Sequence, residues 1–573
     1  MDTNFFKTPV FYKNLLISIL VILGIVIYGE VFFLSYLGGG DFNGYGYWWI
    51  ELLKKHLLTE FSFPYFTPAR CGGFLLAADG QVYIFSLYTL VHFFVPHVIW
   101  SMKITNFILS IILASGVYQW LFYLDIKSRA ARLFTGLIVS ISGYWVFHLT
   151  NDGTQLHVQS FAYLPWILVH MEKLFIRAFK WDRACLKTGL WLTLCLLLLG
   201  NGGYFWLQYF PYIFLGRLAA EMISPHDGRA EALKKIGLIL FCFIFAIILS
   251  WPHLGGVLEF EASKFLRNGT GYIPHYGVIG NFKALFQALF SSFFDEKHVI
   301  KGTGNGAIGG IWEFSNFIGT VALVPVVIGL FQFKKLLKSR IFWTFVFASL
   351  VQLAFVRTTH AADLLREVFP FFKSLTHYWR GSATLVLFAS IWMAMGYEVF
   401  FQGRSKVLVF LGLFLMVFHL TEIYHVYQYR LNMSIDPLHN PSLRDIGKEY
   451  KHVPAVCEQQ YAPCELCHLF GYEYWGRVPE ALSFDPAKSV YDSGQEGYYN
   501  MHDIKVLFSK KADHGYFMKH KWPLWPKTDK ADFEKFIRYR QVFPIPLHLR
   551  IMNIISMGCW VVYACLWMGV KCL

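Results

Sequence analysis

The run "NLLISILVILGIVIYGEVFFLSYL" at residues 14–37 decides how the rest of the chain is interpreted. It is apolar over enough residues to cross a bilayer as a helix, because a span needs about 20 predominantly apolar residues. It is too long for the core of a signal peptide, and no cleavage site follows it in "GGGDFN" (38–43). The sequence therefore predicts a membrane helix here that the protein keeps.

The composition extends this interpretation to the whole chain. Hydrophobic residues make up 55%, aromatic residues 19% and charged residues only 15% of it, and the mean hydropathy is +0.43. These values are typical of a polytopic membrane protein and exclude a soluble globule. The net charge of +14 could suggest nucleic acid, but the basic residues form short clusters between apolar segments rather than one basic face. No nucleic-acid partner is expected.

The basic clusters predict the topology. They lie at residues 125–132, 172–183, 227–235, 334–340 and 403–406, with Lys7 and Lys13 before the first span and Lys571 after the last. Cytoplasmic loops carry an excess of Lys and Arg, so these turns and both termini are expected in the cytoplasm. About twelve spans satisfy this requirement. They are 14–37, 101–124, 133–149, 158–175, 185–200, 203–220, 236–252, 313–333, 341–357, 380–402, 406–427 and 548–570.

One apolar segment does not fit as a span. If "QVYIFSLYTLVHFFVPHVIW" (81–100) crossed the bilayer, the basic turn at 125–132 would face outward. We therefore expect it to lie in the membrane interface on the outer side, together with an amphipathic helix near 45–58.

Long loops collect on the outer side, at 38–100, 253–312, 358–379 and 428–547. The predicted organisation is an all-α membrane module at 1–427, a small outer-face domain at 428–547 and a last helix at 548–573. Because the turns on the other side are short, function is expected at the outer face.

Four cysteines lie in these outer loops, namely Cys71, Cys457, Cys464 and Cys467. An oxidising compartment favours disulfides among them, with three ways of pairing. The spacing "CEQQYAPCELCH" (457–468) is also compatible with a zinc site that includes His468. Both interpretations are structural rather than catalytic.

Two carboxylates stand out in the first outer loop. Asp41 follows the first span directly, and Asp79 lies further along, in "FPYFTPARCGGFLLAADGQ" (63–81). An acid at the outer end of a span, beside an interfacial helix, can meet a lipid head group. Such a position suits a reaction whose donor stays in the bilayer.

Several motifs in this order resemble the YfhO-like membrane proteins of the GT-C glycosyltransferase superfamily. They are Asp41, the segment 63–81, "SGYWVFHLTNDGTQLHVQSFAYLPWILVHMEKL" (142–174), "IWEFSNFIGTVALVPVVIGL" (311–330) and "FPFFKSLTHYWRGSATLVLFASIWMAMGYE" (369–398). The resemblance covers most of residues 30–400. The segment 428–547 resembles no family by its motifs.

The resemblance implies a GT-C-like fold and inverting transfer of a sugar from a polyprenyl-phosphate donor to a glycan, lipid or protein acceptor at the outer face. A base must then take the proton of the acceptor hydroxyl, and Asp41 is the candidate. The alternative for Asp41 is a polar helix end after three glycines. Asp79 is expected to position sugar or acceptor. By resemblance, the membrane is a bacterial inner membrane whose catalytic loops face the periplasm.

The departing phosphate needs a cation. Arg380 matches the arginine of the family, whereas the family's second arginine has no counterpart in Gly381-Ser382-Ala383-Thr384. Arg357, His360 and Lys373 lie in the same loop and could replace it. The alternative for Arg380 is an interfacial anchor whose charge reaches water.

Other polar residues are candidates for contact with sugar or acceptor. The segment 148–157 carries His148, Asn151, Asp152 and His157, and further candidates are Asn201, in a turn with nearby aromatic residues, and Glu313, at the end of the loop 253–312. Residues 148–157 could instead cap the helices they join or hold a metal. No cofactor is certain, and the need for a divalent ion such as Mg²⁺ or Mn²⁺ stays open.

Nucleotide chemistry loses support, because "GTGNGAIGG" (302–310) lacks the context of a phosphate-binding loop. The alternative to an enzyme is a flippase, a transporter or a non-catalytic partner for a lipid-linked glycan. A transporter needs polar groups near mid-membrane, whereas the charges here lie mostly at the ends of the predicted spans.

Overall fold

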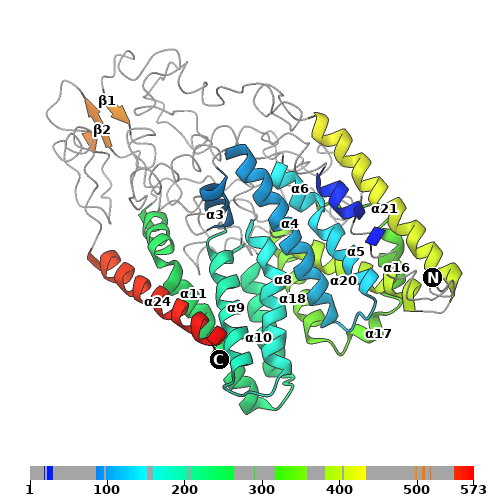
Figure 1. Ribbon diagram of the computed structural model, residues 1–573, viewed down its shortest axis with the longest axis horizontal. Coiled ribbons are helices and arrows are strands. Elements are labelled where there is room, and N and C mark those ends of the chain that lie inside the picture. Colours follow the sequence, from blue (N-terminus) through cyan, green and yellow to red (C-terminus); the bar gives the residue numbers. More distant parts are fainter. Residues whose placement is uncertain are drawn as a thin grey trace.

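The structure is a computed structural model that describes most of the helical part of the chain. The described residues are 18–19, 22–29, 86–95, 98–150, 159–202, 206–207, 209–263, 289–290, 316–357, 381, 383–402, 405–433, 497–499, 506–509, 516–517 and 547–572. The described helices lie side by side, with α21 (Lys406–Met433) and α24 (Leu547–Cys572) on opposite flanks (Figure 1). The predicted all-α polytopic architecture is confirmed for this membrane part.

Six of the described helices are long and apolar enough to cross a membrane. Besides α21 and α24 they are α4 (Val98–Phe122), α9 (Arg183–Gly200), α11 (Arg229–Ser263) and α20 (Ala383–Gln402). They correspond to the predicted spans 101–124, 185–200, 236–252, 380–402, 406–427 and 548–570. Of the first run, 14–37, residues 22–28 are helical, and Tyr28 packs against α5 (Arg129–Ser140) through a hydrogen bond between its hydroxyl and Ser140 Oγ.

The predicted span 133–149 is not one helix. It is divided between α5 and α6 (Gly143–Thr150), and the break falls at Ile141 and Ser142. There the backbone N–H of Gly143 donates to Phe317 O at 2.7 Å, outside the helix. A Ser-Gly pair commonly marks such a break, because glycine tolerates the change in backbone direction.

The prediction for 313–333 is wrong as a continuous helix. Residues 316–322 are not helical, and they are followed by α16 (Leu323–Leu330) and α17 (Phe333–Leu336). Glu422 of α21 accepts hydrogen bonds from the backbone N–H groups of Thr320 and Val321, at 2.8 and 2.9 Å. Gly319 has a φ of 105°, a conformation that favours glycine. Irregular backbone is tolerated in a membrane protein when other groups satisfy it in this way.

Three further predicted spans correspond to helices with somewhat different bounds. The span 158–175 consists of a 3₁₀ turn, η6 (Gln159–Tyr163), and α8 (Leu164–Ile176), with Pro165 near the start of α8. The span 203–220 is shorter than expected, as α10 (Phe210–Ile223), and 341–357 is α18 (Arg340–Arg357).

The segment predicted not to cross contains a short helix, α3 (Leu87–Phe94). Eight residues are only about 12 Å long at the rise of an α-helix, which is too short for a span. The helix packs against α4 through a hydrogen bond from the Tyr88 hydroxyl to Asn106 Oδ1.

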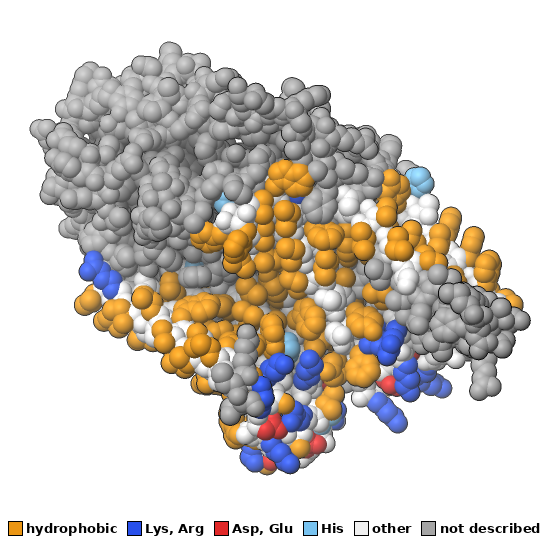
Figure 2. Space-filling view, viewed as in Figure 1, with side chains coloured by type: hydrophobic (Ala, Val, Ile, Leu, Met, Phe, Trp, Pro, Cys, Tyr) orange, Lys and Arg blue, Asp and Glu red, His pale blue; other side chains and the backbone are white. Residues whose placement is uncertain are grey.

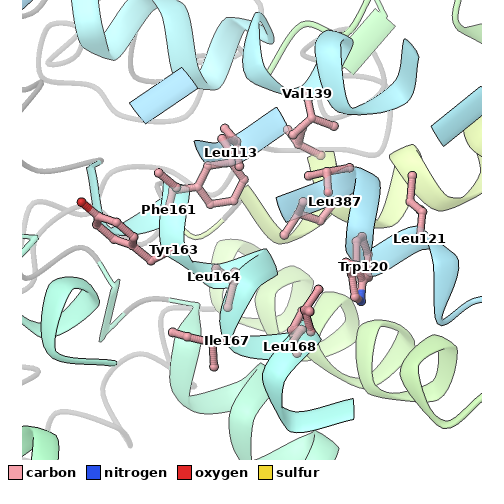
Figure 3. Packing of buried hydrophobic residues seen from close by; sticks show 14 of the residues in the cluster. Leu113, Trp120, Leu121, Val139, Phe161, Tyr163, Leu164, Ile167, Leu168 and Leu387 are labelled. Carbon is pink, nitrogen blue, oxygen red and sulfur yellow. The ribbon is translucent and has the colours of Figure 1, made fainter. Parts of the chain in front are cut away.

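The core is formed where α4, α5, α8 and α20 meet. Its fully buried side chains include Leu113, Trp120, Val139, Leu168 and Leu387 (Figure 3). Small residues allow the closest helix contacts: Gly136 faces Ala114 O, and Gly396 of α20 faces Pro325 O of α16. Such close approach is how helices gain packing energy within a membrane.

The described basic turns lie at one end of the bundle, which we call the basic end. It is made of the turns 125–129, 177–187, 224–235 and 334–340. Figure 2 shows Lys and Arg side chains gathered there, below a band of hydrophobic side chains. Helix α24 runs antiparallel to α9 and α11, because Ser556 donates to Leu249 O while Tyr563 donates to Leu190 O, nearer the basic start of α9. The C-terminal end of α24 therefore lies at the basic end (Figure 1).

A small antiparallel sheet lies within the segment 428–547. It has the order β1 (Gly497–Tyr499), β2 (Val506–Ser509) and β3 (Tyr516–Phe517), with Tyr498 opposite Phe508. It is the only β-structure among the described residues.

Candidate functional site

A group of buried polar side chains lies at the end of the bundle opposite the basic end. We call it the polar layer, and it consists of Tyr88, Asn106, Ser110, Trp145, Ser160, Tyr163, Asn201 and Tyr209. These residues come from the first half of α4, the last residues of α9, the start of α10 and the neighbouring elements α3, α6 and η6. All of them are uncharged.

Helix α4 contributes a polar stripe on one face. Lys103, Asn106 and Ser110 are spaced i, i+3 and i+7 and are almost fully buried. Ser110 Oγ donates to Asn106 O at 2.8 Å and accepts from Trp145 Nε1 at 2.7 Å. This stripe joins α3, α4 and α6 through hydrogen bonds, and Lys103 places a buried cation beside them.

The turn after α9 packs tightly against η6. A Cβ on Gly202 would lie only 2.7 Å from Ser160 N, so only glycine fits there. Ser160 Oγ and the Tyr209 hydroxyl share a hydrogen bond of 2.7 Å. The close contact therefore brings Asn201, η6 and the start of α10 together.

Two polar atoms of this layer have no hydrogen-bond partner in the described part of the chain. Asn201 is 1% exposed; its Nδ2 donates to Leu197 O at 2.8 Å, but its Oδ1 has none. The Tyr163 hydroxyl is likewise buried without one, and it points away from the apolar side chains around it (Figure 3). A buried polar group without a partner is unfavourable by about 1–3 kcal/mol. These atoms are therefore available to hydrogen-bond a ligand or an internal water.

The described structure contains few of the residues that the sequence singled out. Asn201 lies in the polar layer; His148 lies in α6 and Arg357 ends α18, and for these two only the backbone is described. The others lie outside the described residues: Asp41, Asp79, Asn151, Asp152, His157, Glu313, Arg380, Cys71, Cys457, Cys464 and Cys467. Their roles stay predictions. The segment 151–157 joins α6 to η6, both of which contribute to the polar layer.

Sequence reasoning missed most of the polar layer. Lys103, Asn106 and Ser110 could have been found, because polar residues at helical spacing inside an apolar run mark a buried polar face. Tyr163 and Tyr209 carry no comparable signal, since tyrosines are also common at membrane boundaries. Their hydrogen-bonding state depends on neighbours distant in sequence.

The basic end contains a contrasting charged cluster. The Arg217 guanidinium, fully buried, donates through Nε and Nη2 to the two carboxylate oxygens of Glu172, and through Nη1 and Nη2 to Glu221 at 3.2 Å. Glu221 accepts from the backbone N–H and ring of His226, whose Nε2 accepts from Arg340 at 2.8 Å. The cluster fastens α8, α10 and α18 together.

Two carboxylates in the basic turns have perturbed acidity. The hydrogen bond from Lys235 to Asp227 holds the pKa of Asp227 below its usual value. Asp182 accepts from the backbone N–H of Cys185 at 2.8 Å and so begins α9, which lowers the pKa of Asp182.

The described residues contain no group of three or more His, Cys, Asp or Glu side chains able to hold a metal ion. Five of the described cysteines are free thiols, namely Cys185, Cys195, Cys242, Cys559 and Cys565. The divalent ion considered from the sequence stays a prediction.

No protein-family model matches the chain, and no curated protein matches it in sequence. Among solved structures, it is similar to the archaeal oligosaccharyltransferase AglB from Archaeoglobus fulgidus, solved in complex with an inhibitory peptide and a dolichol-phosphate. The TM-score is 0.45 and the sequence identity 12%, over 83% of this chain. The chain spans about 62% of the length of that protein.

Proposed function

We propose that this protein is a membrane glycosyltransferase of the GT-C superfamily, YfhO-like, that transfers a sugar from a polyprenyl-phosphate donor to a glycan, lipid or protein acceptor. The reaction takes place at the end of the bundle opposite the basic end. In a bacterial inner membrane this end faces the periplasm, and both termini face the cytoplasm.

The observation that carries the proposal is the polar layer with its two unpartnered atoms, Asn201 Oδ1 and the Tyr163 hydroxyl. Sugar hydroxyls are hydrogen-bond donors and acceptors, so they are suited to satisfy both atoms. Neutral polar and aromatic side chains can hydrogen-bond and stack against a sugar. A buried cation such as Lys103 can attract the donor phosphate that carries the sugar. The order of the sequence motifs supports the same activity.

The chemistry is an inverting displacement. The acceptor oxygen forms a bond to the anomeric carbon while the bond from that carbon to the donor phosphate oxygen breaks. The acceptor proton passes to the carboxylate of Asp41, and the departing polyprenyl phosphate carries the bonding electron pair. Arg380 and Arg357 stabilise the negative charge that develops on this phosphate.

The remaining candidates position the sugar and the acceptor. They are Asp79, His148, Asn151, Asp152, His157, Asn201 and Glu313. If the reaction needs Mg²⁺ or Mn²⁺, carboxylates of this set would bind it, since both ions prefer oxygen ligands. In this proposal the segment 428–547 is the small outer-face domain that the sequence predicts.

The test is transfer of labelled sugar by purified protein from a panel of polyprenyl-phosphate donors, with the Asp41→Asn variant beside the wild type. Loss of transfer with retained donor binding is expected, because the amide cannot take the proton. Asp125→Asn is the matched control: its side chain is 86% exposed in a turn at the basic end, and it should transfer like the wild type.

Absence of transfer with every donor, in protein shown to be folded, would reject the enzyme. The same preparation in vesicles would then be assayed for movement of lipid-linked glycan between leaflets, which is the activity of a flippase. Transfer that persists in Asp41→Asn would retain the enzyme but reject Asp41 as its base.

A further inference from the structure

Arg132 is a buried cation at the basic end whose hydrogen bonding is incomplete. It lies in the first turn of α5 and is 6% exposed. Its guanidinium carbon lies 4.5 Å from the ring centroid of Tyr118 and 5.1 Å from that of Phe122, both on α4. The two aromatic rings attract the positive charge, but they offer it no hydrogen-bond acceptor in the guanidinium plane.

The Arg132 side chain makes one hydrogen bond in the described structure. Nη1 donates to Tyr118 O at 3.4 Å, a long bond, and Nε is buried without a partner among the described residues. No carboxylate of the described residues lies within ion-pair distance. Glu398 attracts Arg132 electrostatically from a longer distance. Its carboxylate already accepts hydrogen bonds from the backbone N–H groups of Lys127 and Ser128.

Arg217 shows what the same side chain does when it is satisfied. There the edge formed by Nε and Nη2 donates to both carboxylate oxygens of Glu172. In Arg132 the corresponding edge has no acceptor in the described structure. A phosphate presents two oxygens with the spacing of a carboxylate, so it fits this edge in the same way.

The side chains around Arg132 favour the anionic head group of a lipid. Lys127, whose side chain is 76% exposed, and Arg129, also exposed, add positive charge in the adjoining turn. Phe122, near the C-terminal end of α4, is 56% exposed. Basic residues beside an exposed aromatic ring are typical of the boundary where anionic head groups lie.

We propose that Arg132 binds the phosphate of an anionic phospholipid head group in the leaflet at the basic end. Rotation of the exposed Phe122 side chain admits the phosphate to the Nε and Nη2 edge, and Lys127 and Arg129 contact the head group from the water side. This site is separate from the polar layer, so it does not depend on the proposed transfer reaction.

The test measures lipid binding to purified protein in neutral detergent by native mass spectrometry, with phosphatidylglycerol and phosphatidylcholine of identical acyl chains. The wild type should retain phosphatidylglycerol preferentially. Arg132→Gln should weaken its binding by about tenfold, since a hydrogen-bonded charge pair is lost. Arg183→Gln is the matched control: it removes an exposed cation at the same end and should bind like the wild type.

Equal binding of the two lipids by the wild type, or unchanged binding by Arg132→Gln, would overturn the proposal. Inorganic phosphate and glycerol phosphate form a separate arm; if either protects the protein against heat as well as phosphatidylglycerol does, the site takes free anions and the lipid assignment fails. If Arg132→Gln does not fold, Arg132→Lys decides, because it keeps the charge but loses the two-nitrogen edge. Its phosphatidylglycerol binding should still fall, and wild-type binding would contradict the proposal.

Discussion

The two ends of the bundle bury polar groups in different ways. At the basic end, Arg217, Glu172 and Glu221 bury full charges, and each charge is paired and hydrogen-bonded. At the opposite end, the polar layer consists of neutral side chains, and Asn201 Oδ1 and the Tyr163 hydroxyl are left without partners. The Arg217 cluster is complete by itself, whereas the polar layer retains unused hydrogen-bonding capacity.

This difference follows from the energy of burying each kind of group. An unpaired buried charge costs several kcal/mol, so the full charges of the Arg217 cluster depend on their complete pairing. A neutral acceptor without a partner costs only about 1–3 kcal/mol, which a folded protein can tolerate where a ligand later supplies the bond. The comparison therefore distinguishes a structural charged cluster around Arg217 from a polar layer with hydrogen-bonding capacity left for a ligand.

The largest loss of stability is expected when the Arg217 cluster at the basic end is broken. Arg217→Met should lower the free energy of unfolding by about 3–5 kcal/mol, because it leaves two buried carboxylates without a cation. Equilibrium unfolding of the purified protein in mixed detergent measures this. Arg177→Gln is the control, since its pair with Asp182 is about half exposed and should contribute less than about 1 kcal/mol. If the two variants lose the same free energy of unfolding, the buried cluster does not stabilise the contact between α8, α10 and α18 as we infer.

The next effect concerns the packing that forms the polar layer. Gly202→Ala should destabilise the protein by about 1–3 kcal/mol, because the new methyl group collides with the backbone of Ser160. Gly200→Ala, two residues earlier in α9, meets nothing within 4 Å and should be neutral or slightly stabilising. Thermal unfolding of both variants measures the difference, and a Gly202→Ala protein as stable as Gly200→Ala would contradict the contact.

A smaller change in stability is expected at Asn201. Asn201→Leu removes the bond to Leu197 O but also removes an acceptor that has no partner, so stability should change by no more than about 1 kcal/mol. Sugar transfer or donor affinity should fall by about tenfold or more, because the ligand loses a hydrogen bond in a buried site. Unfolding and transfer measured on the same preparation separate the two effects. A variant that is strongly destabilised while its transfer persists would assign Asn201 a structural role.

The smallest effect is a pH dependence confined to the basic end. Asp227 has a pKa below its unfolded value of 3.8, owing to Lys235, so the stability it contributes is present above pH 3.8 and is lost as pH falls through the folded pKa. Because its side chain is 39% exposed, water screens the pair and the contribution is below about 1 kcal/mol. Asp227→Asn should flatten this part of the stability curve, whereas Asn201→Leu should leave it unchanged. An unaltered curve in Asp227→Asn would refute the assignment.

The prediction from sequence was strongest for long helices. The runs that became α4, α9, α11, α20, α21 and α24 are recognisable because hydropathy over about 20 residues is a local property. It was weakest for 133–149 and 313–333. There the break before Gly143 and the irregular residues 316–322 depend on partners far away in the chain, namely Phe317, His419 and Glu422.

The candidate site divides in the same way. Asn201 was a candidate because of its turn, and its contact with a ligand stays a prediction. Lys103, Asn106 and Ser110 have a helical spacing that the sequence alone shows. That Asn201 Oδ1 and the Tyr163 hydroxyl lack partners was not predictable, because it depends on how η6, α9 and α10 pack.

The amino-acid sequence by itself determined a multi-pass helical membrane protein with basic turns, since hydropathy and charge act on each segment separately. Only the tertiary structure decided which buried polar groups are satisfied. Arg217 meets Glu172, Gly202 meets Ser160, and Arg132 keeps an open edge because the packing of distant helices brings acceptors to some groups and not to others.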